Sequence, residues 1–139
     1  MKKEIYLEHA NITVNSINES IKFFTTAFPN FSIRGEGVFN GRRWVHLGND
    51  DTYLALNEPI ENNLKVKKDY VSSGINHIGF VVNDVSELAN RLLHAGYVRD
   101  YPKQVERFRI RDYFADSDGN QFEFVEYLSE VPEERNLYA

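Results

Sequence analysis

Two histidines and one glutamate stand at spacings that could gather them around a metal ion. His9 and His77 lie 68 residues apart, and each is the third residue of a short segment, LEHANITVN in the first copy and INHIGFVVN in the second. Glu123 lies in a third such segment, QFEFVEY. Two imidazoles with one carboxylate suit Fe(II), Zn, Ni, Co or Mn and leave coordination positions free for substrate and water. A single histidine on a strand more often packs or hydrogen-bonds, so the prediction of a metal centre depends on the repeated pair.

The repeat continues from the two histidines into two helices. Each helix begins with a capping pair at N-cap and N3 spacing, and these pairs are Ser16 with Glu19 and Asp84 with Glu87. Apolar residues then recur at helical spacing, so each helix has one face to bury. Pro29 ends the first helix and Gly96 ends the second.

Three extended segments follow each helix. They cover residues 31–35, 42–47 and 52–57 in the first half, and 97–101, 108–114 and 121–127 in the second. Each half therefore predicts one strand, one helix and three more strands. The predicted fold is α+β, with two βαβββ modules in which helices cover one face of a mostly antiparallel sheet. The other face is expected to be open and cupped.

The domain organisation predicted from this pattern is a single domain over residues 1–139. Its expected parts are module 1 at about 5–58, a linker at about 59–74, module 2 at about 75–128 and a charged, loosely held tail at 129–139.

Alternation along the strands predicts which side chains reach the open face. In a strand, successive residues point to opposite faces, and the apolar set should face the helices. This argument places His9, His77 and Glu123 together on the open side. The 68-residue offset carries Glu123 onto Ala55, which also faces outward because Leu54 and Leu56 pack inward.

Aromatic and basic residues are the candidates for contacting a substrate. Tyr53 shares the alternation of Ala55 and could form an aromatic wall, and Trp44 is a second candidate. Arg109, Arg111 and Tyr113 alternate along one strand and could clamp a carboxylate or phosphate.

The two halves conflict at this point. The offset carries Arg111 onto Arg43 rather than Trp44, so either Trp44 with His46 or Arg43 could line the cup. The arginines could instead form an exposed edge paired with acidic residues, which is the slightly favoured alternative.

Length and composition exclude several classes of protein. The chain has 139 residues, 42% hydrophobic and 27% charged, as is ordinary for one globular domain. Its net charge of −5 argues against a nucleic-acid partner. No apolar run is long enough to span a bilayer, and the absence of cysteine excludes thiolate sites and disulfides. We expect a cytoplasmic protein with a small-molecule partner.

Three segments resemble the vicinal oxygen chelate superfamily, which includes glyoxalase I, bleomycin- and fosfomycin-resistance proteins and extradiol dioxygenases. They are Leu7–Val14, Ile75–Phe80 and Phe114–Phe124, and the last is similar to the family motif F-x-D-P-D-G-N-x-x-E, with Ser117 in place of proline. The resemblance implies paired βαβββ modules around a divalent metal held by His9, His77 and Glu123. The fourth family ligand, which can also act as a base, falls on Ala55.

The resemblance implies several functions. The first is a metal-dependent lyase or isomerase that acts on a small oxygen-rich substrate, with Glu123 as ligand and catalytic carboxylate. The alternatives are a bleomycin-resistance-type protein that sequesters a ligand without catalysis, a small extradiol-type dioxygenase, and a family member that has lost its site and serves in protein contacts. The missing fourth ligand and the aromatic content of 14% favour sequestration. A homodimer is expected.

Overall fold

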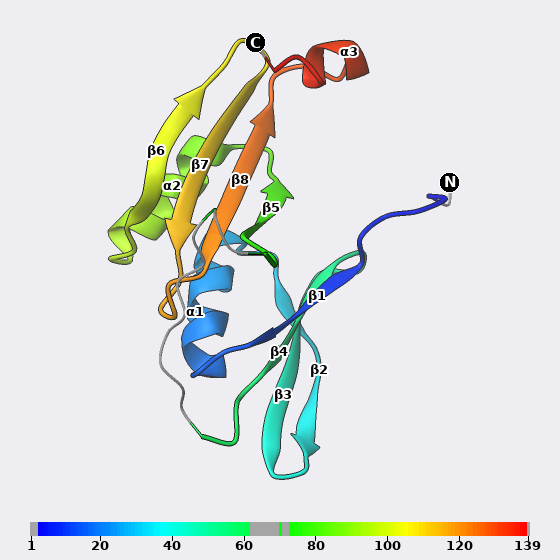
Figure 1. The fold of residues 1–139 in the computed structure, drawn as a ribbon, viewed down its shortest axis with the longest axis vertical. Coiled ribbons are helices and arrows are strands. Elements are labelled where there is room, and N and C mark those ends of the chain that lie inside the picture. The colour runs from blue at the N-terminus through cyan, green and yellow to red at the C-terminus, as the bar shows by residue number, and fades with distance from the viewer. Residues whose placement is uncertain (1–2, 62–69, 71–72, 139) are drawn as a thin grey trace. The chain divides into compact units, whose positions relative to one another are not determined.

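The computed structural model describes residues 3–61, 70 and 73–138, and most of the predicted linker lies outside these residues. The chain divides into two compact units, residues 1–64 and 65–139 (Figure 1). Each unit is described by itself. In the described part of the chain, no helix is long and apolar enough to cross a membrane.

The first unit contains one helix and a four-stranded sheet. In chain order its elements are β1 (His9–Thr13), α1 (Ile17–Ala27), β2 (Ser32–Phe39), β3 (Arg42–Gly48) and β4 (Tyr53–Asn57). The strand order in the sheet is β1-β4-β3-β2. β1 runs parallel to β4, and the other pairs are antiparallel. The crossover from β1 therefore carries α1 onto one face of the sheet.

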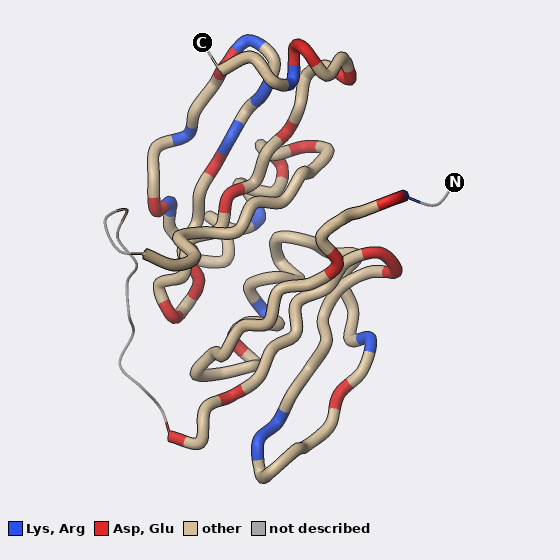
Figure 2. Tube along the Cα trace, turned by 45° about the vertical axis from the view of Figure 1, so that its right-hand side comes forward, with Lys and Arg blue, Asp and Glu red and all other residues tan. Residues whose placement is uncertain are grey.

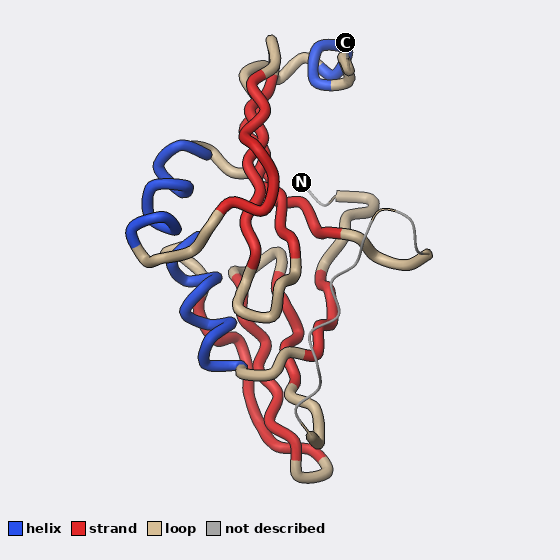
Figure 3. Tube along the Cα trace, turned by 60° about the vertical axis from the view of Figure 1, so that its left-hand side comes forward, coloured by secondary structure: helices blue, strands red, loops and turns tan. Residues whose placement is uncertain are grey.

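The second unit repeats this topology. Its elements are β5 (His77–Val81), α2 (Val85–His94), β6 (Arg99–Val105), β7 (Arg109–Ala115) and β8 (Gln121–Tyr127), followed by α3 (Pro132–Arg135). The strand order is β5-β8-β7-β6, with β5 parallel to β8. The predicted α+β fold of two βαβββ modules is confirmed. Each long helix packs on its own sheet, α1 on β3 and β4 and α2 on β7 and β8 (Figure 3).

Both helices begin as the capping pairs predict. Ser16 Oγ accepts a hydrogen bond from the Glu19 amide at 3.2 Å, and Asp84 Oδ1 accepts one from the Glu87 amide at 3.0 Å. A second cap comes from the end of the sheet. Glu58 Oε1 accepts from the first helical amide of α1 at 2.9 Å, and Glu126 does the same for α2 at 2.9 Å. The Glu58 carboxylate is therefore engaged in capping α1. It accepts from a backbone amide that has no partner within the helix.

The core of each unit lies between its helix and its sheet. In the first unit, Phe23 and Phe24 of α1 are buried with alternate residues of β3 and β4. In the second, Phe114, Phe122 and Phe124 are buried beneath α2. The residues between these apolar positions project to the opposite, open face of each sheet.

Two segments differ from the sequence prediction. β2 extends to Phe39 rather than ending near residue 35, because Asn40 and Gly41 both have positive φ (51° and 74°) and close a two-residue hairpin into β3. The tail has a short helix that the sequence pattern does not predict. This helix is α3, and the Arg135 guanidinium lies 4.1 Å from the ring centroid of Tyr127.

Candidate functional site

The open face of the first sheet carries Trp44 and His46 of β3, not the Arg43 guanidinium. Trp44 pairs with Asn57 of β4 and His46 pairs with Ala55, so all four share one face. Arg43 points to the helix side, where its Nη1 donates to Asn18 Oδ1 at 2.7 Å.

The conflict between the halves arises from turn length. The β3–β4 turn contains residues 49–52, whereas the β7–β8 turn contains residues 116–120 and is one residue longer. Ala55 therefore pairs with His46, but its equivalent Glu123 pairs with Tyr113. A one-residue change in turn length shifts the pairing register by one and exchanges the residues on the two faces of the strand. Arg111 of β7 therefore occupies the position of Trp44 in β3.

The second unit places His77 and Glu123 beside each other on its open face. His77 Nε2 lies 3.7 Å from Glu123 Oε1, and their side chains are 30% and 15% exposed. Gly79 is paired with Glu123 and has no side chain to cover it; a Cβ there would lie 3.6 Å from Glu123 Oε2. The carboxylate and the imidazole thus face the same open space.

Each predicted histidine ligand is oriented by the residue before it. His77 Nδ1 lies 2.9 Å from Asn76 Oδ1, and His9 Nδ1 lies 2.8 Å from Glu8 Oε1. Both oxygens can only accept, so Nδ1 carries the proton in each pair. In the neutral ring this tautomer leaves the Nε2 lone pair for a metal, as a metal-ligating histidine requires.

The predicted three-residue site is divided between the two units. His9 belongs to the first unit, whereas His77 and Glu123 belong to the second. Among the residues that the structure describes, no group of three or more His, Asp or Glu side chains is gathered as a metal centre. The His77–Glu123 pair is the part of the predicted site that lies within one unit.

A cavity of about 400 Å³ surrounds this pair in the second unit. It is lined by Tyr70, His77, Tyr101, Gln104, Arg111, Tyr113 and Glu123. Burial and a hydrogen bond to the Glu123 carboxylate raise the pKa of the Tyr113 hydroxyl. Arg111 Nη1 donates to the Tyr113 hydroxyl at 3.3 Å. Arg111 Nε is buried and has no hydrogen-bond partner in the described part of the chain.

The arginine stripe on β7 is paired, but the expectation that it forms an exposed edge is wrong. Arg109 is only 9% exposed, and Glu106 bridges it to Arg111. Hydrogen bonds from Arg109 and Arg111 lower the pKa of Glu106. Arg109 lies 4.7 Å from the ring centroid of Tyr138 and does not line the cavity. Only Arg111 of the two predicted arginines therefore reaches the site.

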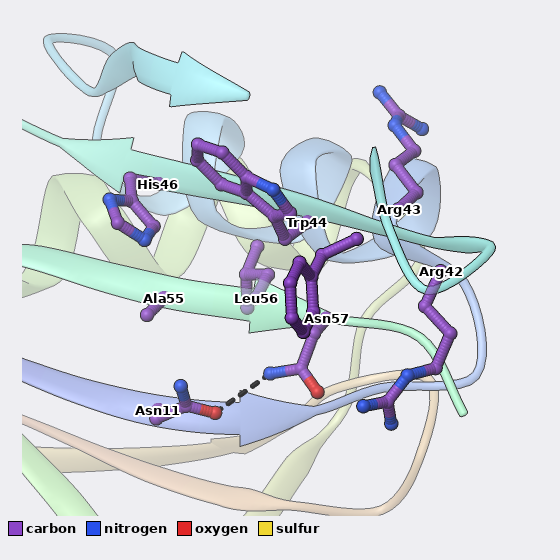
Figure 4. A pocket seen from close by; sticks show the side chains of 9 residues that line it. Asn11, Arg42, Arg43, Trp44, His46, Ala55, Leu56 and Asn57 are labelled. Atoms are coloured by element: carbon purple, nitrogen blue, oxygen red, sulfur yellow. Dashed lines mark hydrogen bonds between the residues drawn. The ribbon is translucent and has the colours of Figure 1, made fainter. Parts of the chain in front are cut away.

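The first unit has its own cavity, of about 460 Å³, on the open face of its sheet (Figure 4). It is lined by Asn11, Phe39, Arg42, Arg43, Trp44, His46, Ala55, Leu56 and Asn57. Tyr53 lies beside this cavity in a row of rings, stacked on His9 with centroids 4.7 Å apart and 4.8 Å from His46. Trp44 continues the row at 4.9 Å from His46.

Several of the residues that line the two cavities were not predicted from the sequence. Tyr70, Tyr101 and Gln104 carry no motif that could have marked them. Phe39 and Arg42 could have been found, because Asn-Gly between two strands is a strong hairpin signal and the residues flanking it share a face.

Comparisons with known proteins agree with this architecture. A crystal structure of a glyoxylase/bleomycin resistance protein/dioxygenase domain from Frankia sp. EAN1pec is 20% identical and has a TM-score of 0.74, covering 90% of this chain and 99% of that chain. A glyoxalase family protein from Bacillus cereus is 17% identical with a TM-score of 0.75, covering 92% and 97%. At these identities the likeness shows the fold. No curated protein matches the chain.

A third similar structure contains a metal. It is a mutant of the fosfomycin resistance protein FosX from Listeria monocytogenes, complexed with Mn(II) and 1S,2S-dihydroxypropylphosphonic acid. It is 20% identical with a TM-score of 0.70 and covers 94% of this chain and 96% of that chain. The family model of the glyoxalase/bleomycin resistance protein/dioxygenase superfamily matches residues 6–124. The chain therefore belongs to the glyoxalase/bleomycin resistance protein/dioxygenase superfamily.

Proposed function

We propose that this chain is a divalent-metal-dependent enzyme acting on a small oxygen-rich substrate, with a lyase or isomerase reaction favoured. The observation that carries the proposal is the pairing of His77 Nε2 with Glu123 Oε1 at 3.7 Å while Asn76 holds Nδ1. The equivalent contact of Glu8 with His9 gives a second imidazole of the same tautomer. A packing histidine needs neither a fixed tautomer nor a neighbouring carboxylate, so two such residues favour ligation.

The donor set suits the metal that the family implies. His9, His77 and Glu123 would hold a divalent ion of the Fe, Zn, Ni, Co or Mn group. A bound ion of this kind chelates adjacent substrate oxygens and stabilises enolate-like charge as a Lewis acid. The Mn(II) complex of the similar FosX protein supports a divalent ion on this fold. Ala55 offers no donor, which leaves the fourth position to substrate or water.

Arg111 is the residue of the second cavity that we propose to orient the substrate. Its Nη1 donates to the Tyr113 hydroxyl, and its buried Nε still lacks an acceptor in the described part of the chain. Glu106 fixes the other side of the guanidinium. An oxygen of the substrate would supply the missing acceptor, which is worth more for a charged donor than for a neutral one.

The row of rings on the first unit favours a second candidate, a binding protein without catalysis. His9, Tyr53, His46 and Trp44 form an uninterrupted series of ring contacts. Such a surface can hold a planar ligand without a metal. Metal binding separates the two candidates, because sequestration does not need His77 and Glu123.

The test is the metal content of protein purified without an affinity tag, after Fe(II), Zn, Ni, Co and Mn have been offered in turn. We expect close to one ion per chain and its loss in His77→Ala. His94→Ala is the matched control, because His94 Nδ1 bonds the Asn90 carbonyl at the end of α2. Absence of every metal, or equal metal in His77→Ala, would contradict the proposal.

We further propose that the chain works as a cytoplasmic homodimer. Light scattering measures the mass directly, and 16.2 kDa would be the mass of a monomer.

A further inference from the structure

The cavity of the first unit lies at the hairpin end of its sheet, on the face away from α1. The Asn40–Gly41 turn places Phe39 opposite Arg42, and Trp44 follows on the same face. Gly37 pairs with Trp44, and a Cβ at position 37 would lie 3.0–3.1 Å from three atoms of the indole. The indole therefore fills the space above Gly37 and forms a flat wall.

The polar groups of this cavity are almost all donors. Among the residues that the structure describes, no acidic side chain lines it. The guanidinium of Arg42 forms no ion pair or hydrogen bond within residues 3–61, 70 and 73–138, whereas that of Arg43 donates to Asn18. Figure 4 shows these two arginines pointing to opposite sides of β3. Asn57 donates to Asn11 Oδ1 at 2.7 Å, which leaves the amide group of Asn11 as a further donor.

The charge distribution along β3 supports an anionic ligand at this end. In Figure 2 the start of β3 is basic, whereas the turn from β3 to β4 at its other end is acidic. The chain as a whole has a net charge of −5, so a local surplus of positive charge runs against the average. An unpaired guanidinium beside aromatic rings binds a carboxylate best when the rings also cover the ligand.

We propose that this cavity binds a planar aromatic or conjugated carboxylate. The ring lies against Trp44 and Phe39, and the carboxylate meets Arg42. At about 460 Å³ the cavity has the volume of a small-ligand site. The residues that would bind this ligand all belong to the first unit, so the binding itself does not depend on the metal site. The inference rests on the proposed function only where it takes the ligand to be part of the substrate.

The experiment uses trans-cinnamate as the probe and the full-length chain treated with a chelator. Trp44 is the only tryptophan, so a single indole N–H signal in the ¹H–¹⁵N spectrum reports on the cavity. Two further probes separate the contribution of the carboxylate charge from that of the planar conjugated group. trans-Cinnamamide keeps the planar conjugated group without the charge, and cyclohexanecarboxylate keeps the charge without the planar ring.

We expect a saturable shift of the indole signal with cinnamate, and a Kd about tenfold or more higher for each of the other two probes. Arg42→Gln should raise the Kd for cinnamate by a similar factor. Arg107→Gln, which removes the same charge from an exposed position of the second unit, should leave it unchanged. No saturable shift with cinnamate, equal affinity for all three probes, or equal effects of the two variants would overturn the proposal.

The probe comparison uses the unmodified chain, so the test stands even if Arg42→Gln does not fold. The cinnamate titration is run without metal, so its result is independent of the metal-content test. If the chain binds cinnamate but no metal, the proposed function is refuted and this inference stands. Metal binding without cinnamate binding would do the reverse.

Discussion

Replacing Asn76 by alanine removes the side chain that contacts Nδ1 of His77. The Asn76 Oδ1 to His77 Nδ1 distance is 2.9 Å, and the imidazole is 30% exposed, so water can replace part of this contact. The lost hydrogen bond is worth about 1 kcal/mol, and restoring the proton and rotamer freedom of the ring adds a similar amount. The sum corresponds to metal affinity about 10- to 100-fold weaker, the usual effect of removing such a partner.

The assay is calorimetric titration of Asn76→Ala with the divalent ion that the unmodified chain binds best. Asn90→Ala is the matched control, because Asn90 lies exposed on α2 away from the pair. We expect one site per chain in all three proteins, with weakened affinity only in Asn76→Ala. Unchanged affinity in a folded Asn76→Ala variant would refute the argument that Asn76 selects the ligating tautomer.

Three other perturbations test the packing around the site. Asp112→Asn should lower the free energy of unfolding by about 2 kcal/mol, and an unchanged Tm would contradict this. Asp112 is fully buried and accepts from Arg99 Nε at 2.9 Å and Nη2 at 3.0 Å, whereas Arg99 is partly hydrated. Glu106→Gln should destabilise at neutral pH, and its difference from the parent should shrink as pH falls below about 4.3, because a lowered folded pKa gives stability that acid removes; a constant difference in thermal unfolding from pH 7 to pH 3 would be the opposite result. Gly37→Ala should move the indole of Trp44, since the new Cβ would lie 3.0 Å from its Cζ2, and shift the single tryptophan's fluorescence maximum; an identical spectrum would show that the contact is absent.

Local signals in the sequence were enough to predict the two long helices. Ser16 with Glu19 and Asp84 with Glu87 mark helix starts that the structure confirms. Such signals act within a few residues, and the 68-residue repeat fixes which segments correspond.

Features that depend on strand register were harder to predict. One extra residue in the β7–β8 turn shifts the register of β7 relative to β3, so Trp44 corresponds to Arg111 rather than to Asp112, where the 68-residue offset would place it. Alternation within a strand is visible in the sequence, but the phase between strands depends on turn length. Reading each turn separately would have resolved it.

Contacts that join distant residues could not be predicted at all. Glu58 caps α1 across 41 residues, and Arg99 donates to the buried Asp112 across 13 residues. Such contacts form only when the folded sheet brings separate segments together, and no spacing within one segment encodes them.

The most direct test of the metal assignment observes the ligating atoms themselves. The chain has four histidines, so a long-range ¹H–¹⁵N spectrum resolves every imidazole during titration with Zn(II). We predict that the Nε2 signals of His9 and His77 shift together and are complete at one equivalent, while those of His46 and His94 stay in place. A His9 signal that does not move while His77 binds, or four unchanged imidazoles, would contradict a site made of His9, His77 and Glu123.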